Sequence, residues 1–248
     1  GDLDGNIWRF DFTSPTADVP APELFAKLPA NQSVTSGPVV RVAPITRNRY
    51  VFVGTGRLLG QDDIYTTHQQ SFYAFRDGTR LARWESGEGD APTFPITRSV
   101  MVANTDLLNP ITPDPDKPAG WYHDLLTAGE RVVIDPQDTD LGKISWLGTI
   151  PQTTQLCNEG GSSRIYAANF ETGQSQLYDP STLSGGTPTR ITSFDPKTGA
   201  VGLRLVRVGG NIRAVITGQF NELKLTQGYL RYLDPRSMGW REITEPGS

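Results

Sequence analysis

The sequence predicts an all-β fold made of short strands, and three observations support this. Turn-forming residues are abundant, with 26 Gly and 19 Pro in 248 residues, while hydrophobic residues make up only 36%. That composition favours many short strands joined by turns over long helices. A short aromatic strand pattern also recurs along the chain, and hairpin patterns precede three of its copies. We therefore expect residues 1–248 to form a single all-β segment.

The recurring pattern has a small or turn residue, then apolar-aromatic-x-apolar, then a polar turn residue. Its four copies span residues 5–11, 71–78, 163–169 and 228–235. Each copy is too short for a helix and is rich in aromatic and β-branched residues. Repetition of one strand unit is typical of a β-propeller. The alternative is a set of unrelated hairpins in a β-sandwich.

The spacing of the aromatic residues indicates insertions between the copies. Trp8 and Tyr73 are 65 residues apart, Tyr73 and Tyr166 are 93 apart, and Tyr166 and Tyr232 are 66 apart. A regular blade needs about 40–50 residues. The sequence therefore predicts a partial, modified β-propeller of roughly three to four blades with long loop insertions.

Hairpins are expected before three of the copies. The predicted strand pairs are 37–44 with 49–54, 130–134 with 143–149, and 201–208 with 212–217. The last pair flanks Gly209, Gly210 and Asn211, a strong turn signal. A propeller removes exposed strand edges by closing on itself. With so few blades, this segment must hide its edges in another way or have them covered by a partner.

Two stretches do not fit the strand pattern. Residues 13–36 mix Pro, Ser and Thr with a possible short helix over 22–28. Residues 85–120 contain clusters of Gly, Asp and Pro. Loops of this length in a compact domain are usually functional or mobile.

Charge and hydropathy exclude some classes of protein. The net charge of −4 gives no electrostatic reason to bind nucleic acid or an anionic membrane. No window approaches 18 apolar residues, so no transmembrane segment is expected.

The chain starts at Gly1 without a signal peptide, and we expect a piece of a longer protein. Cys157, the single cysteine, is either a buried small hydrophobic residue or half of a disulfide whose partner lies elsewhere.

Several phrases, taken in order, resemble one known family. They are residues 1–11, 51–60, 70–75, 120–133 and 157–167, which include Gly-Asp-Leu-Asp-Gly-Asn-Ile-Trp and Cys-Asn-Glu-Gly-Gly-Ser-Ser-Arg-Ile-Tyr. Over about residues 1–175 the chain is similar to the C-terminal propeller of the type IV pilus tip proteins, the PilC/PilY family. Residues 176–248 share only its general blade character.

The resemblance implies a non-enzymatic adhesin and pilus biogenesis factor. Such proteins are exported through the periplasm and outer membrane and displayed extracellularly at the pilus tip. They support pilus extension and retraction, twitching motility and attachment to host cells or abiotic surfaces. The implied partners are the minor pilins and the surface itself. A purely structural scaffold, a quinoprotein-like enzyme and a secreted sugar-binding propeller are the alternatives.

The family also has an EF-hand-like calcium loop, which the resemblance would place before the segment matching residues 1–11. In this chain Asp2, Asp4 and Asn6 alternate as calcium ligands do. However, Gly5 stands at the fourth position of the loop rather than the sixth, and no Glu follows at the twelfth. A turn leading into the Trp8 strand is therefore favoured over a metal site, and calcium is not expected to bind this segment.

Hydrolytic chemistry has little support. His68 and His123 are the only imidazoles, and neither lies near a nucleophile-elbow pattern. Both are expected at the surface. Quinoprotein dehydrogenases share the blade pattern, but one cysteine cannot supply the adjacent cysteine pair that many of them use. Asp138 and Asp140 are expected to be solvated residues of a hairpin turn, and Asp62 and Asp63 a charge pair in a loop.

Aromatic residues outside the strands are the main candidates for partner binding. These are Trp84, Trp121, Tyr122 and Trp240, which lie beside Gly, Pro or charged residues. The alternative is that they plug the ends of the blades. Trp8 and Trp146 lie within strand patterns and are expected in the core.

Overall fold

A computed structural model describes residues 1–10, 12, 20–44, 46–78, 92–139, 142–151, 161–182, 187–196, 199–208, 211–218 and 223–225. The fold is all-β, and the described residues contain no α-helix. The strands are β1 (Asn6–Arg9), β2 (Glu23–Lys27), β3 (Val39–Val42), β4 (Arg49–Gly54), β5 (Ser71–Arg76), β6 (Val102–Ala103), β7 (Gly120–Asp124), β8 (Gln137–Thr139), β9 (Lys143–Ile150), β10 (Ser162–Asn169), β11 (Leu177–Tyr178), β12 (Arg190–Ile191), β13 (Ala200–Val208), β14 (Asn211–Gly218) and β15 (Leu223–Leu225). Three short 3-10 helices are η1 (Gln61–Tyr65), η2 (Arg98–Val100) and η3 (Pro180–Thr182).

The strands form several small sheets, mostly antiparallel. The largest has the order β3-β4-β5-β7-β6, in which β6 and β7 are parallel. Two three-stranded sheets follow, with orders β10-β9-β8 and β13-β14-β15, and β1 pairs with β2 ahead of all of them. Sequence neighbours are therefore mainly sheet neighbours, as expected for chains of hairpins.

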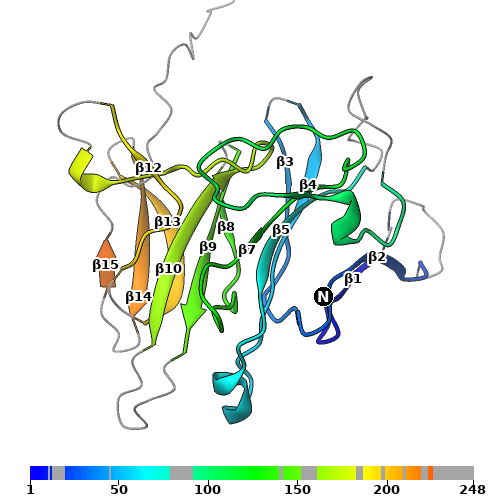
Figure 1. The fold of residues 1–248 in the computed structure, drawn as a ribbon, viewed down its shortest axis with the longest axis horizontal. Helices are drawn as coiled ribbons and strands as arrows, with labels where there is room; N and C mark the ends of the chain where they lie inside the picture. Colours follow the sequence, from blue (N-terminus) through cyan, green and yellow to red (C-terminus); the bar gives the residue numbers. More distant parts are fainter. Residues whose placement is uncertain are drawn as a thin grey trace, which may run out of the picture.

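The sheets stand beside one another in sequence order, from β1–β2 at one side to β13–β15 at the other (Figure 1). Strand β5 shows how a sheet in the middle of this row is covered on both faces. Phe72 packs with residues of β9 and β10, whereas its neighbour Tyr73 packs with residues of β1 and β2. Successive side chains of a strand point to opposite faces, so a doubly covered strand buries apolar side chains on both faces. Residues 71–75 are accordingly all buried.

Stacked aromatic rings join the five-stranded sheet to the β8–β10 sheet. The ring of Trp146 lies 3.9 Å from that of Phe72, with an interplanar angle of 3°, and 5.1 Å from that of Tyr166. Phe52 approaches Phe170 to 4.7 Å between ring centroids. All five rings are almost completely buried. This aromatic layer is the largest core cluster of the described residues.

A second layer lies on the other face of the β8–β10 sheet. There Leu147 and Ile165 pack against Leu203 and Ile216 of the β13–β15 sheet. Each sheet thus uses one set of alternate residues for the preceding sheet and the other set for the next.

Most of the predicted strands are confirmed. Strands β3, β4 and β5 match the first hairpin and the aromatic copy after it, and β10 matches the third copy. The hairpin of β13 and β14 is also confirmed, and β15 is the third strand of its sheet among the described residues. The aromatic copy at residues 228–235 and Cys157 lie outside the described residues. Within the described residues the row of sheets does not close into a ring.

Two element predictions are wrong. Residues 22–28 contain strand β2 rather than a helix, because pairing with β1 and a bridge from Ala26 to Ile96 satisfy its backbone. Residues 130–134 form no strand, and β8 takes the place beside β9. Instead, Arg131 exchanges backbone hydrogen bonds with Thr149, and Val132 N–H donates to Thr55 O, so this segment links two sheets.

Candidate interaction surface

The two described aromatic residues among the candidates for partner binding, Trp121 and Tyr122, are not fully exposed. Trp121 is fully buried in the aromatic layer, and its Nε1–H donates to Phe170 O at 2.8 Å. Tyr122 is partly buried beneath the guanidinium of Arg98, which lies 3.7 Å from its ring centroid. Trp84 and Trp240 lie outside the described residues. The strand pairing of β7 with β5 places Trp121 inside, which no local pattern indicated.

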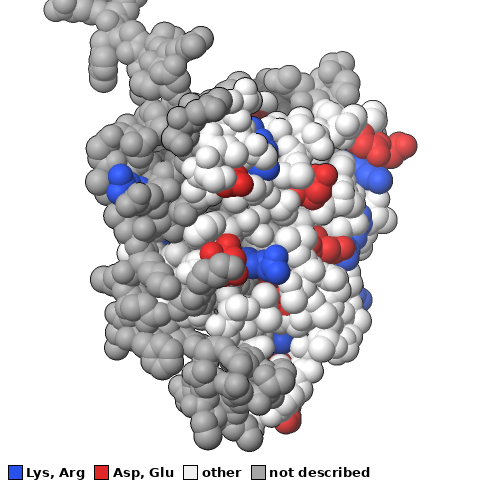
Figure 2. Space-filling view, turned by 60° about the vertical axis from the view of Figure 1, so that its left-hand side comes forward, with Lys and Arg blue, Asp and Glu red and all other residues white. Residues whose placement is uncertain are grey.

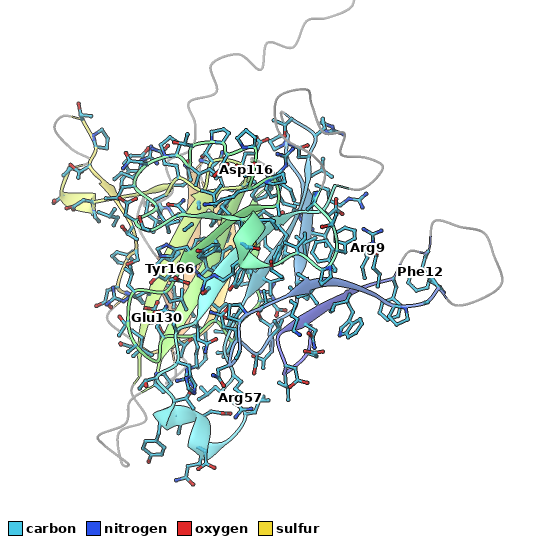
Figure 3. The ribbon with its side chains drawn as sticks, turned by 45° about the vertical axis from the view of Figure 1, so that its right-hand side comes forward. Arg9, Phe12, Arg57, Asp116, Glu130 and Tyr166 are labelled. Carbon is cyan, nitrogen blue, oxygen red and sulfur yellow. The ribbon has the colours of Figure 1, made fainter. Side chains whose placement is uncertain are left out.

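The two tryptophans predicted in the core differ in how far their side chains are buried. Trp146 is completely buried, which confirms the prediction, but Trp8 is 44% exposed. A register irregularity between Ile7 and Trp8 lies in the β1–β2 pair, and Ile7 takes the inward position. Phe12 follows beyond the end of β1, on the right of Figure 3, and is also exposed.

Exposed apolar residues instead gather on the segment 57–65, here called the 57–65 loop, which contains η1. Leu58, Leu59 and Tyr65 are 39%, 69% and 54% exposed. The loop projects from the lower end of the molecule, where Figure 1 shows η1 beyond the sheets and Figure 3 labels Arg57. The sequence analysis did not identify this surface. A signal for it is the adjacent pair of leucines between Gly56 and Gly60, because a turn-rich segment offers no strand whose inward face could bury both side chains.

Arg131 holds the base of the 57–65 loop. Its side chain is buried, and the guanidinium donates to Arg57 O at 2.9 Å, Asp63 O at 2.5 Å and Thr66 O at 3.0 Å. It also donates to Gly129 O at 2.9 Å. Five N–H donors in a rigid plane suit this set of carbonyl oxygens. Burial lowers the pKa of Arg131, although the guanidinium stays charged.

Asp63 closes the loop from within. Its carboxylate accepts from the backbone N–H groups of Leu59 at 2.9 Å and Gly60 at 3.1 Å, and from Arg57 Nε at 2.6 Å. The hydrogen bond from Leu59 N–H is the main cause that lowers the pKa of Asp63. Asp63 is thus a buried member of the predicted loop charge pair, paired with Arg57.

Gly56 is required where the loop leaves β4. Its φ of +124° disfavours any L side chain, and a Cβ there would lie 2.4 Å from Cβ of Arg131. The glycine therefore allows Arg131 to enter beneath the loop.

A buried polar group lies next to this anchor. Tyr166 Oη donates to Glu130 Oε1 at 2.7 Å, and the two side chains lie close together in Figure 3. Glu130 Oε2 accepts from Thr127 N–H at 3.2 Å and lies 3.7 Å from Arg164 Nε. Burial raises the pKa of Glu130 and that of Tyr166. This group fixes the segment that carries Arg131 against β10.

His123 is buried rather than exposed, which corrects the sequence prediction. It faces the ring of Tyr166 at 5.7 Å between centroids, and its Nδ1 is 2.7 Å from Asn104 O. Its Nε2 has no hydrogen-bond partner among the described residues. Alternation along β7 places His123 on the same face as Trp121, and hence in the core. Burial lowers the pKa of His123, against the opposing effects of Asn104 O, Asp124 and Asp106.

This lowered pKa predicts a loss of stability in acid. The folded state binds fewer protons than the unfolded state below about pH 6.5, the ordinary His value, so the free energy of unfolding should fall as the pH drops below it. The raised pKa of Glu130 acts in the opposite direction. His123→Asn keeps a donor for Asn104 O and should flatten this pH dependence in urea unfolding followed by circular dichroism. His68→Asn, at the exposed histidine, is the control. An unchanged slope in His123→Asn would contradict the assignment.

The predicted calcium ligands form a closed turn. The Asp2 carboxylate accepts from Asp4 N–H, Asn6 N–H, Asn6 Nδ2 and Trp8 Nε1, at 2.8–3.0 Å. The Trp8 bond is the main cause that lowers the pKa of Asp2 to about 2. Four donors occupy the acceptor capacity of the carboxylate, so these residues do not fit a calcium site. No group of three or more His, Cys, Asp or Glu suited to a metal occurs in the part of the chain that the structure describes.

Charge does not mark out a binding site on the face that Figure 2 shows. There the described acidic and basic residues are scattered among uncharged ones. Asp138 is paired with Arg41 through Nη2 at 2.7 Å, and Asp140 lies outside the described residues. No helix of the described residues is long and apolar enough to cross a membrane.

Comparison with known proteins points to one family. No protein-family profile matches the chain. It is 27% identical over 265 residues to the type IV pilus biogenesis factor PilY1 homolog of Xylella fastidiosa (strain Temecula1), which includes 99% of this chain and 21% of the relative. It is 24% identical over 220 residues to the type IV pilus biogenesis factor PilY1 of Pseudomonas aeruginosa (strain PAO1), covering 70% of this chain and 19% of the relative. The chain thus spans about a fifth of the length of these curated relatives.

The fold has a solved counterpart. The crystal structure of the Pseudomonas aeruginosa PilY1 C-terminal domain superposes with a TM-score of 0.65 at 19% sequence identity. The match covers 91% of this chain and 56% of that domain. The arrangement of sheets is therefore shared with that domain.

Proposed function

We propose, on the premise that this chain is a C-terminal region of the PilY1 family, that it serves type IV pilus biogenesis as a protein-binding module and not as an enzyme. The observation that carries the binding role is the 57–65 loop, an exposed apolar surface on a buried support. The similarity to pilus biogenesis factors over 99% of the chain supports the biological context.

The 57–65 loop has the physical properties of a binding surface. Leu58, Leu59 and Tyr65 expose apolar area on one short segment, and large apolar or aromatic residues dominate the energy of protein interfaces. The buried contacts of Arg131 and Asp63 fix the backbone beneath them. A surface ordered before binding loses little conformational entropy when the partner arrives. The loop can therefore bind a partner protein through a small interface area.

We assign the partner of this surface to the minor pilins of the pilus tip. The finer roles that belong to this proposal are surface display after export, support of pilus extension and retraction, twitching motility, and attachment to host cells or abiotic surfaces. Mixed surface charge favours an apolar protein contact over a polyanion such as nucleic acid. We propose no calcium site in this segment, and the N–H donors that occupy the Asp2 carboxylate support this.

The test is a triple variant in the full-length protein, expressed in its own organism. Leu58→Ser, Leu59→Ser and Tyr65→Ser together should weaken partner binding by about thirtyfold or more, the equivalent of about 2 kcal/mol for lost interface anchors. Surface pili and twitching should fall accordingly, and minor pilins should no longer co-purify with the protein.

The matched control is Val40→Ser with Val201→Ser, which removes exposed apolar side chains from β3 and β13 instead. This control should keep wild-type twitching and co-purification. Wild-type motility in a triple variant that is exported at the normal level would refute the role of the loop. Loss of motility in the control as well would mean that the effect is not specific to the loop.

A further inference from the structure

A largely apolar cavity lies at the end of the molecule opposite the 57–65 loop. Figure 3 labels Asp116 at this upper end and Arg57 at the lower end, and the sequence neighbours of Asp116, Pro115 and Lys117, line the cavity. Its volume is about 350 Å³, within the range of small-molecule sites. The apolar lining comes from the five-stranded sheet and from the proline-rich segment 111–118: Tyr50, Val102, Ile111, Pro113, Pro115 and Pro118.

The segment 111–118 is held in place at both ends. Ile111 N–H donates to Thr172 O at 2.8 Å, and Ala119 N–H donates to Val100 O at 3.1 Å. Its three prolines fix their own φ angles, which leaves the backbone between these bonds few alternative conformations. A wall ordered in this way before binding loses little conformational entropy when a ligand arrives.

One buried polar side chain lines the cavity without a partner. Asn48 is only 5% exposed, and its backbone O accepts from Ala43 N–H at 2.7 Å. Its side-chain amide makes no hydrogen bond to any described residue. Neither amide atom is sealed from solvent, so a ligand in the cavity can reach the amide. A buried amide without a partner costs free energy, and a ligand with one acceptor and one donor would remove that cost.

The charged side chains of the lining give no net charge. Arg76 and Lys117 are cationic, and Asp114 and Glu171 are anionic. Lys117 lies 3.8 Å from Asp114, and Glu171 accepts a hydrogen bond from Thr46 Oγ1. A charged ligand would lose hydration on entering the apolar lining and would meet no excess of opposite charge. The cavity therefore favours a neutral ligand.

We propose that this cavity binds an uncharged peptide segment of a partner protein, with one apolar side chain in the cavity and one peptide group on the Asn48 amide. A peptide group carries one N–H donor and one C=O acceptor, which the amide of Asn48 complements. A hydrocarbon would leave that amide unpaired, and a sugar would place unpaired hydroxyl groups against the prolines. The inference is independent of the proposed pilin contact, because the cavity and the 57–65 loop lie at opposite ends.

The inference is tested by saturation-transfer NMR and NMR titration on the full chain. The probes are N-acetyl-L-leucinamide, N-acetyl-L-phenylalaninamide and N-acetyl-L-tryptophanamide, each a single apolar residue between two peptide groups. At least one should bind, and N-acetylglycinamide and the lysine and aspartate derivatives should bind about tenfold more weakly or less. Asn48→Leu removes the amide and should weaken binding by about tenfold. Pro113→Trp fills the cavity from its exposed rim and should also weaken binding by about tenfold or more.

The matched controls are Asn109→Leu and Pro110→Trp, the same changes at exposed residues that do not line the cavity. Both should bind the probe as the wild type does, as should the triple serine variant of the 57–65 loop, and circular dichroism should show that all variants are folded. Four results would overturn the inference: no apolar probe binds the folded wild type, N-acetylglycinamide binds equally well, folded Asn48→Leu or Pro113→Trp keeps its affinity, or only the 57–65 loop variant loses binding.

Discussion

Replacement of Trp146 by alanine is expected to lower the free energy of unfolding by about 3–5 kcal/mol, the usual cost of removing a large buried aromatic side chain. The indole lies between Phe72 and Tyr166, with ring centroids 3.9 and 5.1 Å away. It therefore joins two sheets, and the cavity left behind would remove contacts from both. Urea unfolding followed by far-UV circular dichroism measures the loss.

Trp8→Ala is the matched control for this prediction. Trp8 is 44% exposed, and its Nε1–H makes one hydrogen bond to Asp2, so the change should cost about 1 kcal/mol. Equal losses in the two variants would contradict the assignment of Trp146 to the layer between the sheets. A third variant, Trp146→Phe, should lose less than Trp146→Ala. It keeps a ring in the stack and removes an indole N–H that has no partner among the described residues.

Replacement of Arg131 by methionine is expected to cost about 3 kcal/mol or more. It removes a guanidinium donor from four carbonyl oxygens at the base of the 57–65 loop. Asp63 O keeps the Thr66 N–H and Oγ1 donors, but each buried acceptor left without a donor costs about 1–3 kcal/mol. Methionine is similar to arginine in length, so the decrease in the free energy of unfolding reflects lost hydrogen bonds more than lost packing. The 57–65 loop should also lose protection in hydrogen exchange before the sheets do.

Arg41→Met is the control, because it makes the same change at an arginine that pairs with the carboxylate of Asp138 and whose side chain is 49% exposed. A surface ion pair contributes about 1 kcal/mol or less, so this variant should stay close to the wild type. If Arg131→Met were as stable as Arg41→Met and kept its loop protection, the loop would not depend on Arg131. The preorganised surface in the proposed function would then lose its physical basis.

The strands were predictable wherever the local pattern and the tertiary environment agree. Residues 71–76 read as a strand from their aromatic and apolar run, and they form β5 in the centre of the largest sheet. The Gly209-Gly210-Asn211 signal likewise predicted the pairing of β13 with β14. Residues 22–28 misled because a five-residue strand of good helix formers, Glu-Leu-Phe-Ala-Lys, is decided by its partner and not by its propensity.

The candidate surface was much less predictable. Trp121 and His123 seemed exposed because Gly, Tyr and Asp surround them, yet pairing with β5 places both in the core. Arg131 seemed to be an ordinary strand residue, and nothing near it in sequence indicates that its donors reach residues 57, 63 and 66. Contacts across more than 60 positions depend on the register of whole sheets.

The sequence by itself determined the all-β class, the order of the main hairpins and the resemblance to a pilus protein family, because each depends on residues close together in the chain. Only the tertiary structure decided which aromatic residues are buried. The sequence of a strand shows that successive residues face opposite sides of the sheet. It does not show whether other sheets cover both of those sides. The recurring aromatic strand is therefore a reliable sign of a sheet. The surface available for binding, with Leu58, Leu59 and Tyr65 on the outside and Arg131 beneath, follows from which sheet faces find a partner.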